Sequence, residues 1–420
     1  MNQFLLYEFK TYMKKKNFNK QELAINSGIH ISDISRIFNN KKTLSIRYLD
    51  AITKAFDLPI GFFYSKYAYL CFNQNRSLNK RRSIDYLYNC VMNNFNDEFS
   101  AMISIILEEN SKIIRTKNLQ ILFLVAEKLF LEGHEKESLP IYDIIINHMP
   151  DHSDEEVSIS YFRKYYITRL TEEGQSVLGQ VLENLRYMPE KYQELTLLCI
   201  TNTKYMLKEW DKLLYYAKRL EKIAKNKDHY GRALMYQCIA LRNLDKNKED
   251  VLELIDRYEK VNEYFAEIAV GNRFVALIDF GELHYVDDYY EWIKDREDLY
   301  VGIPRILEAY VRLGRFNDAL NLINSHGTEI AALESSADLF KQQLYLDYSF
   351  ALALLKCETS MYIEGLDAFI VAAMKMKNVG MYEKVNQCLL AIWHYKEFLT
   401  PQLEIKYIQL LSNRKFLQIS

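Results

Sequence analysis

Two short helical patterns separated by a glycine, within residues 20–39, constrain the fold of this chain more than any other feature. The first pattern, KQELAINS, directly follows Asn19, a residue type that caps helix starts well. Gly28 comes next and can adopt the left-handed backbone conformation that a tight turn needs. The sequence therefore predicts two short helices joined by a glycine turn.

The second of these helices is predicted to run from about residue 32 to residue 39 and to have two distinct faces. Ile34, Ile37 and Phe38 fall on its inner side, and the polar side chains recur at i, i+3, i+4 and i+7 on the other. Helices over 4–16 and 45–56 would complete a small bundle. The polar face consists of Ser32, Ser35, Arg36 and Asn39.

Residues 20–59 resemble the phage-repressor class of helix-turn-helix domains over nearly their whole length. One departure is Asn40, where that class usually has Gly, although Asn tolerates the left-handed region better than most residues. Another is Asp33, an acid beside the polar face that would repel phosphate unless it accepted a hydrogen bond from a cytosine. The resemblance implies that residues 1–70 form a DNA-binding domain.

Roles in DNA binding follow from the positions of the polar residues in such a domain. Side chains at the start of the first short helix and after the second would contact phosphate. Side chains at the start and on the outer face of the second helix would reach base edges, with Arg36 best suited to a guanine. The predicted phosphate contacts are Lys20, Gln21, Lys41, Lys42 and Arg47, and the predicted base-reading face comprises His30, Ser32, Ser35, Arg36 and Asn39.

The distribution of charge agrees with a nucleic-acid-binding amino-terminal region. Residues 1–82 hold fifteen Lys and Arg against five Asp and Glu, a formal charge of +10. The remaining residues then carry −12 of the total of −2. A basic segment attached to an acidic body suits a protein in which the basic segment meets a polyanion.

Beyond residue 83 the sequence predicts stacked helical hairpins. Only 13 Gly and 6 Pro occur in 420 residues, which favours long helices joined by short loops. LGRFNDALNLI at 313–323 has the form of a tetratricopeptide hairpin, and turns in similar segments recur at one or two intervals of about 34–38 residues. The fold class is therefore predicted as all-α, a helix-turn-helix domain followed by a right-handed superhelix. The equivalent turns are Gly133, Lys208, Asp245 and Gly314, with weaker ones near Thr171, Gly281, Cys357 and His394.

Several other functional classes find no support in the sequence. No catalytic motif, phosphate-binding loop or zinc-protease motif occurs, so neither an enzyme nor a cofactor or metal site is expected. The six cysteines are scattered and read as buried thiols in a reducing compartment. No signal peptide and no apolar run long enough for a membrane span occurs, which predicts a cytoplasmic protein.

A repressor-type head joined to a tetratricopeptide body resembles the peptide-pheromone receptors of Gram-positive bacteria and their phages. Within that family the segments YSKYAYLCFNQNRSLNKRRSIDYLY, ITNTKY and GRALMYQCIALRN most resemble the arbitrium receptors, which control lysis and lysogeny. The resemblance implies that a short signalling peptide binds the repeats and switches DNA binding. The matching peptide-contacting positions are Asn202, Arg232 and Asn243, with Asn272 as a further candidate.

The residues themselves suit a peptide ligand. Arg232 and Asn243 lie three helical turns apart and so would share one face of a helix. Arginine is a natural partner for a carboxylate, and asparagine can satisfy both polar groups of a peptide bond. Residues 378–382, however, contain no acid with which to read a basic side chain of the peptide, as such a receptor would.

The domain organisation and assembly are predicted as follows. Residues 1–70 form the DNA-binding domain, 71–98 a helical connector, 99–380 the peptide-sensing repeats and 381–420 capping and dimerisation helices. A homodimer on an inverted-repeat operator is expected, because one head offers too little contact for a tight site. The alternatives are a prophage or mobile-element repressor whose repeats only dimerise or bind a protein antirepressor, and a repeat adaptor with a vestigial head.

Overall fold

The computed structural model describes residues 3–244 and 247–412, and the predicted turn at Asp245 lies outside this part of the chain. Its regular structure is helical, apart from one isolated bridge between Phe72 and Leu78. The all-α fold class is therefore confirmed. The chain divides into two compact units, residues 1–193 and 194–420. The predicted boundaries at residues 70, 98 and 380 stay predictions, since the division into compact units falls at a different place.

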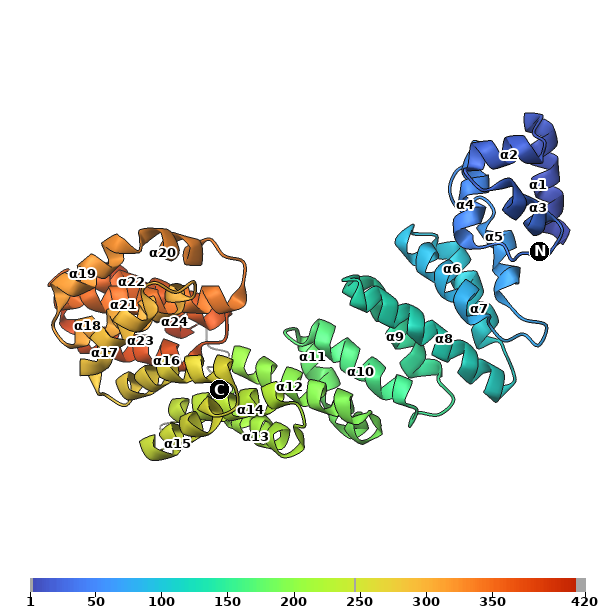
Figure 1. The fold of residues 1–420 in the computed structure, drawn as a ribbon. Helices are drawn as coiled ribbons and strands as arrows, with labels where there is room; N and C mark the ends of the chain where they lie inside the picture. The colour runs from blue at the N-terminus through green and yellow to red at the C-terminus, as the bar shows by residue number, and fades with distance from the viewer. Residues whose placement is uncertain (1–2, 245–246, 413–420) are drawn as a thin grey trace. The chain divides into compact units, whose positions relative to one another are not determined.

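The first unit contains the helix-turn-helix bundle and the first hairpins (Figure 1). Its helices are α1 (Gln3–Lys16), α2 (Lys20–Ser27), α3 (Ile31–Phe38), α4 (Ile46–Ala55), α5 (Tyr64–Tyr67), η1 (Ala68–Cys71), α6 (Lys80–Met92), α7 (Asn96–Leu107), α8 (Lys112–Leu131), α9 (Glu135–His148), α10 (Glu155–Thr168), α11 (Glu172–Asn184) and η2 (Leu185–Tyr187), and α12 (Glu190–Met206) begins at its end.

The second unit consists of further antiparallel hairpins (Figure 1). Its helices after α12 are α13 (Trp210–Ile223), α14 (Lys227–Asn243), α15 (Lys248–Glu259), α16 (Glu263–Asp279), η3 (Leu283–Tyr285), α17 (Val286–Ile293), α18 (Leu299–Arg312), α19 (Phe316–Ser325), α20 (Gly327–Glu334), α21 (Leu339–Glu358), α22 (Tyr362–Asn378), α23 (Tyr382–His394), η4 (Lys396–Phe398) and α24 (Pro401–Ser412). None of the described helices has the length and hydropathy that a bilayer crossing needs.

Local sequence signals account for the turn between α2 and α3. Asn19 caps α2 by accepting hydrogen bonds from the backbone N–H groups of Gln21 and Glu22, and the Glu22 side chain completes a capping box. Gly28 ends the helix in the left-handed conformation at φ +66°. Asn40, in place of the usual glycine, is also left-handed at φ +55°. The left-handed conformations predicted at Gly28, between α2 and α3, and at Asn40, after α3, are both confirmed.

The bundle is joined tightly to the hairpins that follow it. A single cluster of buried apolar side chains extends from Leu5 to Ile159. At the joint, the fully buried rings of Tyr64 and Tyr67 lie 5.6 and 5.9 Å from the ring of Tyr86 on α6. Because this core is continuous, the helix-turn-helix bundle and the first hairpins form one packed body.

Gly61 is a test of that joint. It has φ +88°, and a Cβ added there would lie 2.6 Å from the ring of Phe95. Gly61→Ala should therefore lower the free energy of unfolding by about 2–4 kcal/mol, through backbone strain and overpacking together. Gly133→Ala is the matched control, because its φ is +86° but no heavy atom lies within 4 Å of the added Cβ. It should cost only about 1 kcal/mol in urea unfolding. Equal losses of unfolding free energy in the two variants would show that Phe95 can move to accommodate the added methyl group at little cost.

The predicted hairpin turns fall between antiparallel helices. Gly133, Lys208 and Gly314 all have positive φ and separate α8 from α9, α12 from α13 and α18 from α19. Gly281 has φ +92° after α16, and Thr171 caps α11. The helical-repeat body is therefore confirmed. The weaker turns near Cys357 and His394 follow the ends of α21 and α23: the chain turns at Ser360, and His394 is the last residue of α23.

Candidate functional site

The polar face predicted on α3 is exposed in the structure. Ser32, Arg36 and Asn39 are exposed and Ser35 is half-buried, whereas Ile34 and Ile37 are fully buried. Among the described residues, Arg36 makes no ion pair, and neither do the predicted phosphate contacts Lys20, Lys41 and Arg47; Gln21 is also exposed. The helix therefore presents an uncommitted guanidinium on a rigid support, as base reading requires.

His30 and Ser32 are tied to each other at the start of α3. Nδ1 of His30 accepts a hydrogen bond from the Ser32 backbone N–H at 3.3 Å and lies 2.8 Å from the Ser32 hydroxyl. His30 is thus the helix cap, a role that the sequence analysis did not assign to it. Its ring remains exposed beside the polar face.

Lys42, predicted as a phosphate contact, is paired within the domain. Its ammonium lies 2.6 Å from the carboxylate of Asp33, which also accepts a hydrogen bond from the Tyr48 hydroxyl at 2.8 Å. The hydrogen bonds from Lys42 and Tyr48 hold the pKa of Asp33 below its usual value. Asp33 is therefore already engaged, and its possible contact with a cytosine stays a prediction.

This pairing gives a test on DNA affinity. Asp33→Asn should release the Lys42 charge, raise affinity for unrelated duplexes and steepen the dependence of log K on log salt by about 0.9. Asp57→Asn is the control, because Asp57 pairs with Lys16, 2.7 Å away and outside the predicted interface. Fluorescence anisotropy titrations over a range of salt would measure both. If both variants change DNA affinity and salt dependence equally, the change in net charge of the protein explains the effect, and release of Lys42 does not.

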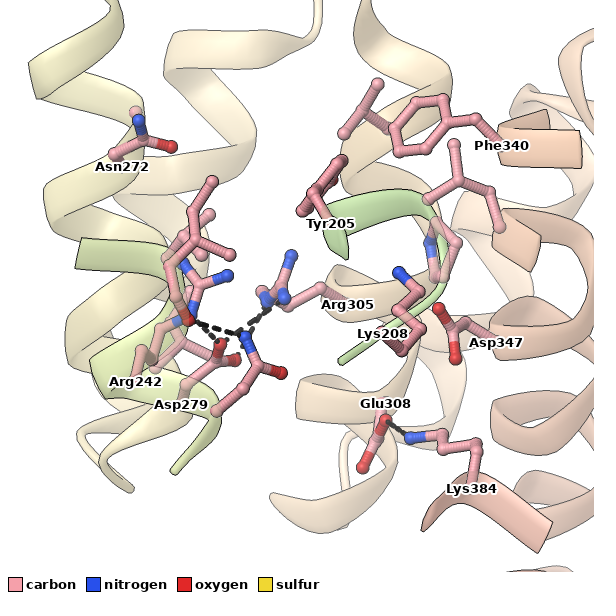
Figure 2. A pocket seen from close by; sticks show the side chains of 18 of the residues that line it. Tyr205, Lys208, Arg242, Asn272, Asp279, Arg305, Glu308, Phe340, Asp347 and Lys384 are labelled. Carbon is pink, nitrogen blue, oxygen red and sulfur yellow. Dashed lines mark hydrogen bonds and ion pairs between the residues drawn. The ribbon is translucent and has the colours of Figure 1, made fainter. Parts of the chain in front are cut away.

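A cavity of about 930 Å³ lies within the second unit (Figure 2). Several polar residues of its wall recur at helical spacing, so that they lie on the same face of one helix. Arg305, Glu308 and Arg312 follow i, i+3, i+7 on α18 and share one face, and Asn272 and Asp279 are seven residues apart on α16. Other charged lining residues include Lys208, Arg242 on α14, Asp347 on α21 and Lys384 on α23.

Part of this charge is internally balanced. Asp279 lies between two arginines, 3.0 Å from Nε of Arg242 and 2.9 Å from Nε of Arg305 (Figure 2). Burial alone would raise the pKa of Asp279, but the charges of Arg305 and Arg242 outweigh it and hold the pKa below its usual value. Two guanidinium groups against one carboxylate leave a net positive charge in this corner.

Lys208 and Asp347 are charged groups without an ion pair among the described residues, although the Lys208 ammonium lies over the rings of Tyr205 and Trp210, 5.3 and 5.5 Å from their centres. Neither side chain makes a hydrogen bond or an ion pair in the described part of the chain, and Figure 2 shows both at the cavity. Burial lowers the pKa of Lys208 and raises that of Asp347. Unpaired charges in such a setting are costly, which is typical of groups that a ligand completes.

The four predicted peptide contacts fall into two groups in the second unit. Asn243 and Asn272 line the cavity, but Asn202 and Arg232 do not. Asn202 instead donates a hydrogen bond to the Tyr236 hydroxyl at 3.2 Å. Burial raises the pKa of Tyr236 to about 12, and the charge of Arg232 opposes that rise. The Tyr236 ring lies 5.7 Å from the ring of Tyr205, which lines the cavity. The second group is thus one aromatic side chain away from the cavity.

Arg232 and Asn243 both belong to α14, as the spacing predicts. Asn243 donates one amide N–H to the Ile239 carbonyl at 2.8 Å, which leaves its second N–H and its oxygen for a ligand. Arg232 makes no ion pair with any described residue. Peptide binding by these four residues stays a prediction. Four charged cavity residues were not predicted, because they come from four helices and no sequence motif connects them: Arg242, Asp279, Arg305 and Asp347.

Comparisons with known proteins identify the amino-terminal domain. Residues 9–63 match the model of a helix-turn-helix family, so this segment is a helix-turn-helix domain. No curated protein sequence matches the chain. Among solved structures, one that matches is described as a Rap protein complexed with competence and sporulation factor. The two sequences are 14% identical, the match covers 77% of this chain and 98% of the Rap protein chain, and the TM-score is 0.40.

Proposed function

We propose that this protein is a sequence-specific DNA-binding regulator. The observation that carries the proposal is the exposed face of Ser32, Arg36 and Asn39 on α3, in a helix-turn-helix domain whose neighbouring cations Lys41 and Arg47 are unpaired among the described residues. Bases would be read by the face and phosphates bound by the cations. Such a protein would work in the cytoplasm and need no catalytic or cofactor chemistry.

Selection of duplexes from a random pool by the full-length chain tests this proposal. A short consensus should be enriched, and it should be an inverted repeat if two heads bind together. Enrichment without any consensus would leave only electrostatic binding and would overturn the proposal.

We further propose that the cavity of the second unit binds a short signalling peptide that switches DNA binding, as in phage lysis–lysogeny control. The volume of about 930 Å³ lies within the range of about 300–1,000 Å³ common for ligand pockets. Its wall combines apolar surface with Asn243, Asn272 and unpaired charges, which suits a ligand with both amide and ionic groups. The alternative is a repressor whose repeats only dimerise or bind an antirepressor, and the absence of any peptide binding would favour it.

We also propose a homodimer through the last two described helices. Leu390 and Trp393 on α23 and Ile405 and Ile408 on α24 are each about 60–70% exposed and offer apolar surface to a partner. Trp393→Glu with Ile408→Glu should convert the dimer to a monomer in sedimentation experiments at micromolar concentration. Leu320→Glu, at an exposed residue on α19, should not. A monomeric wild-type chain would contradict the proposal.

A further inference from the structure

A second basic surface lies outside the predicted DNA contacts. Residues 73–84 and 110–126 together contain seven Lys and Arg and no Asp or Glu. Their charge density exceeds that of the helix-turn-helix bundle, in which acids accompany the cations. We call this surface the connector patch; it consists of Arg76, Lys80, Arg81, Arg82, Lys112, Arg115 and Lys117.

The fold brings these two stretches together. Asn118 on α8 accepts a hydrogen bond from the Leu78 backbone N–H at 2.8 Å and donates one to the Arg76 carbonyl at 3.4 Å. The helix that follows this loop, α6, packs along α8. Cations separated by about 35 residues in the sequence therefore share one region of the first unit.

The cations of the connector patch are not held in ion pairs, although the charge of Lys112 acts on the nearby carboxylates of Asp151 and Asp154. None of the seven forms an ion pair with a described residue. Arg76, Lys80, Arg81, Lys112 and Lys117 are exposed, and Nε of Arg115 is inaccessible to solvent without a hydrogen-bond partner. Like charges gathered in this way repel one another, and a polyanion bound across them would relieve that repulsion.

The patch is held in a fixed position relative to the DNA-binding bundle. The buried Tyr67 hydroxyl donates to the Leu44 carbonyl at 2.9 Å, in the segment between Lys42 and Arg47. The same tyrosine ring stacks on Tyr86 of α6, 5.9 Å away, and α6 begins at Lys80. Buried contacts thus link the patch directly to the loop after the reading helix.

We propose that the connector patch binds the phosphates of DNA that flanks the bases read by α3. This inference rests on the proposed DNA-binding function. DNA is the fitting polyanion because the patch shares one continuous core with the helix-turn-helix domain. The patch would therefore contact a duplex bound to α3 at a fixed distance from the bases that α3 reads. Contacts of this kind read no sequence; they add affinity, salt dependence and length to the site.

The test compares two duplexes and two double variants of the full-length protein. One duplex contains only the selected consensus, and the other adds about 10 bp of arbitrary sequence, one helical turn, on each side. Lys80→Ala with Arg81→Ala removes two exposed cations of the patch. Lys136→Ala with Lys191→Ala removes two exposed cations of the same unit that also lack ion pairs among the described residues, and serves as the control.

On the extended duplex the patch variant should bind roughly tenfold more weakly at moderate salt, with a salt slope reduced by about 1.8. On the short duplex, patch variant, control and wild type should agree. Equal weakening on both duplexes, or no weakening on either, would overturn the proposal. The same variants are also titrated with RNA and with anionic vesicles. If the patch variant loses affinity only for one of these, that ligand is the partner and the proposal is overturned. Failure of the wild type to prefer its consensus would instead count against the proposed function itself.

Discussion

Replacing Arg36 by alanine should weaken binding to the selected operator by about 1–3 kcal/mol and relax the preference at one base pair. The guanidinium is exposed on α3 and makes no ion pair among the described residues, so its loss leaves no internal charge uncompensated. The α3 helix should stay folded, because Ile34, Ile37 and Phe38 hold it. Titration of a panel of single-base operator variants measures both effects.

Lys41→Ala provides the contrast. Lys41 follows α3, and its side chain is exposed. Its removal should weaken binding to all duplexes alike and lower the salt slope by about 1, because phosphate contacts carry no sequence information. If the Arg36 variant behaves like the Lys41 variant, Arg36 contacts phosphate and the base-reading assignment is wrong.

The second large effect concerns Arg232 and a peptide carboxylate. The probe is the tightest binder from a library of synthetic peptides about five to seven residues long, a size suited to the cavity. Amidating its carboxy terminus, or making Arg232→Ala, should each cost about 2–4 kcal/mol in calorimetric titration. The two changes together should cost little more than either, because they remove the same charge pair.

Arg242→Ala is the matched control for this cycle. Arg242 lies on the same helix and lines the cavity, but it is committed to Asp279, which Arg305 would still neutralise. Its loss should therefore add to that of amidation. If the cost of amidation is coupled to Arg242→Ala and is additive with Arg232→Ala, the peptide carboxylate lies inside the cavity, away from Tyr236. If no peptide binds, a repeat body that only dimerises becomes the better account.

The helix-turn-helix domain was largely predictable because its signals are local. The cap at Asn19, the left-handed turn at Gly28 and the apolar spacing of Ile34 and Ile37 each involve neighbours within one or two helical turns. The hairpin turns at Gly133 and Gly314 were found for the same reason, since a left-handed residue ends a helix wherever the repeat places it.

The cavity was not predictable, because its chemistry depends on contacts between distant helices. Asp279, Arg305 and Asp347 belong to three helices whose packing fixes which charges are paired and which are not. The pairing of Lys42 with Asp33 also escaped prediction, since it needs Tyr48 of α4 to lie beside α3. Of the predicted peptide contacts, Asn243 and Asn272 marked the cavity in advance.

The most direct test of the central claim is the affinity of the full-length protein for its selected operator, measured with and without a saturating amount of the bound peptide. The account predicts a change of about 5- to 150-fold in either direction, as is typical of coupled sites, with an equal reciprocal change in peptide affinity when operator is present. A ligand that binds the two states equally shifts nothing. Identical operator affinities with and without a tightly bound peptide would contradict the account.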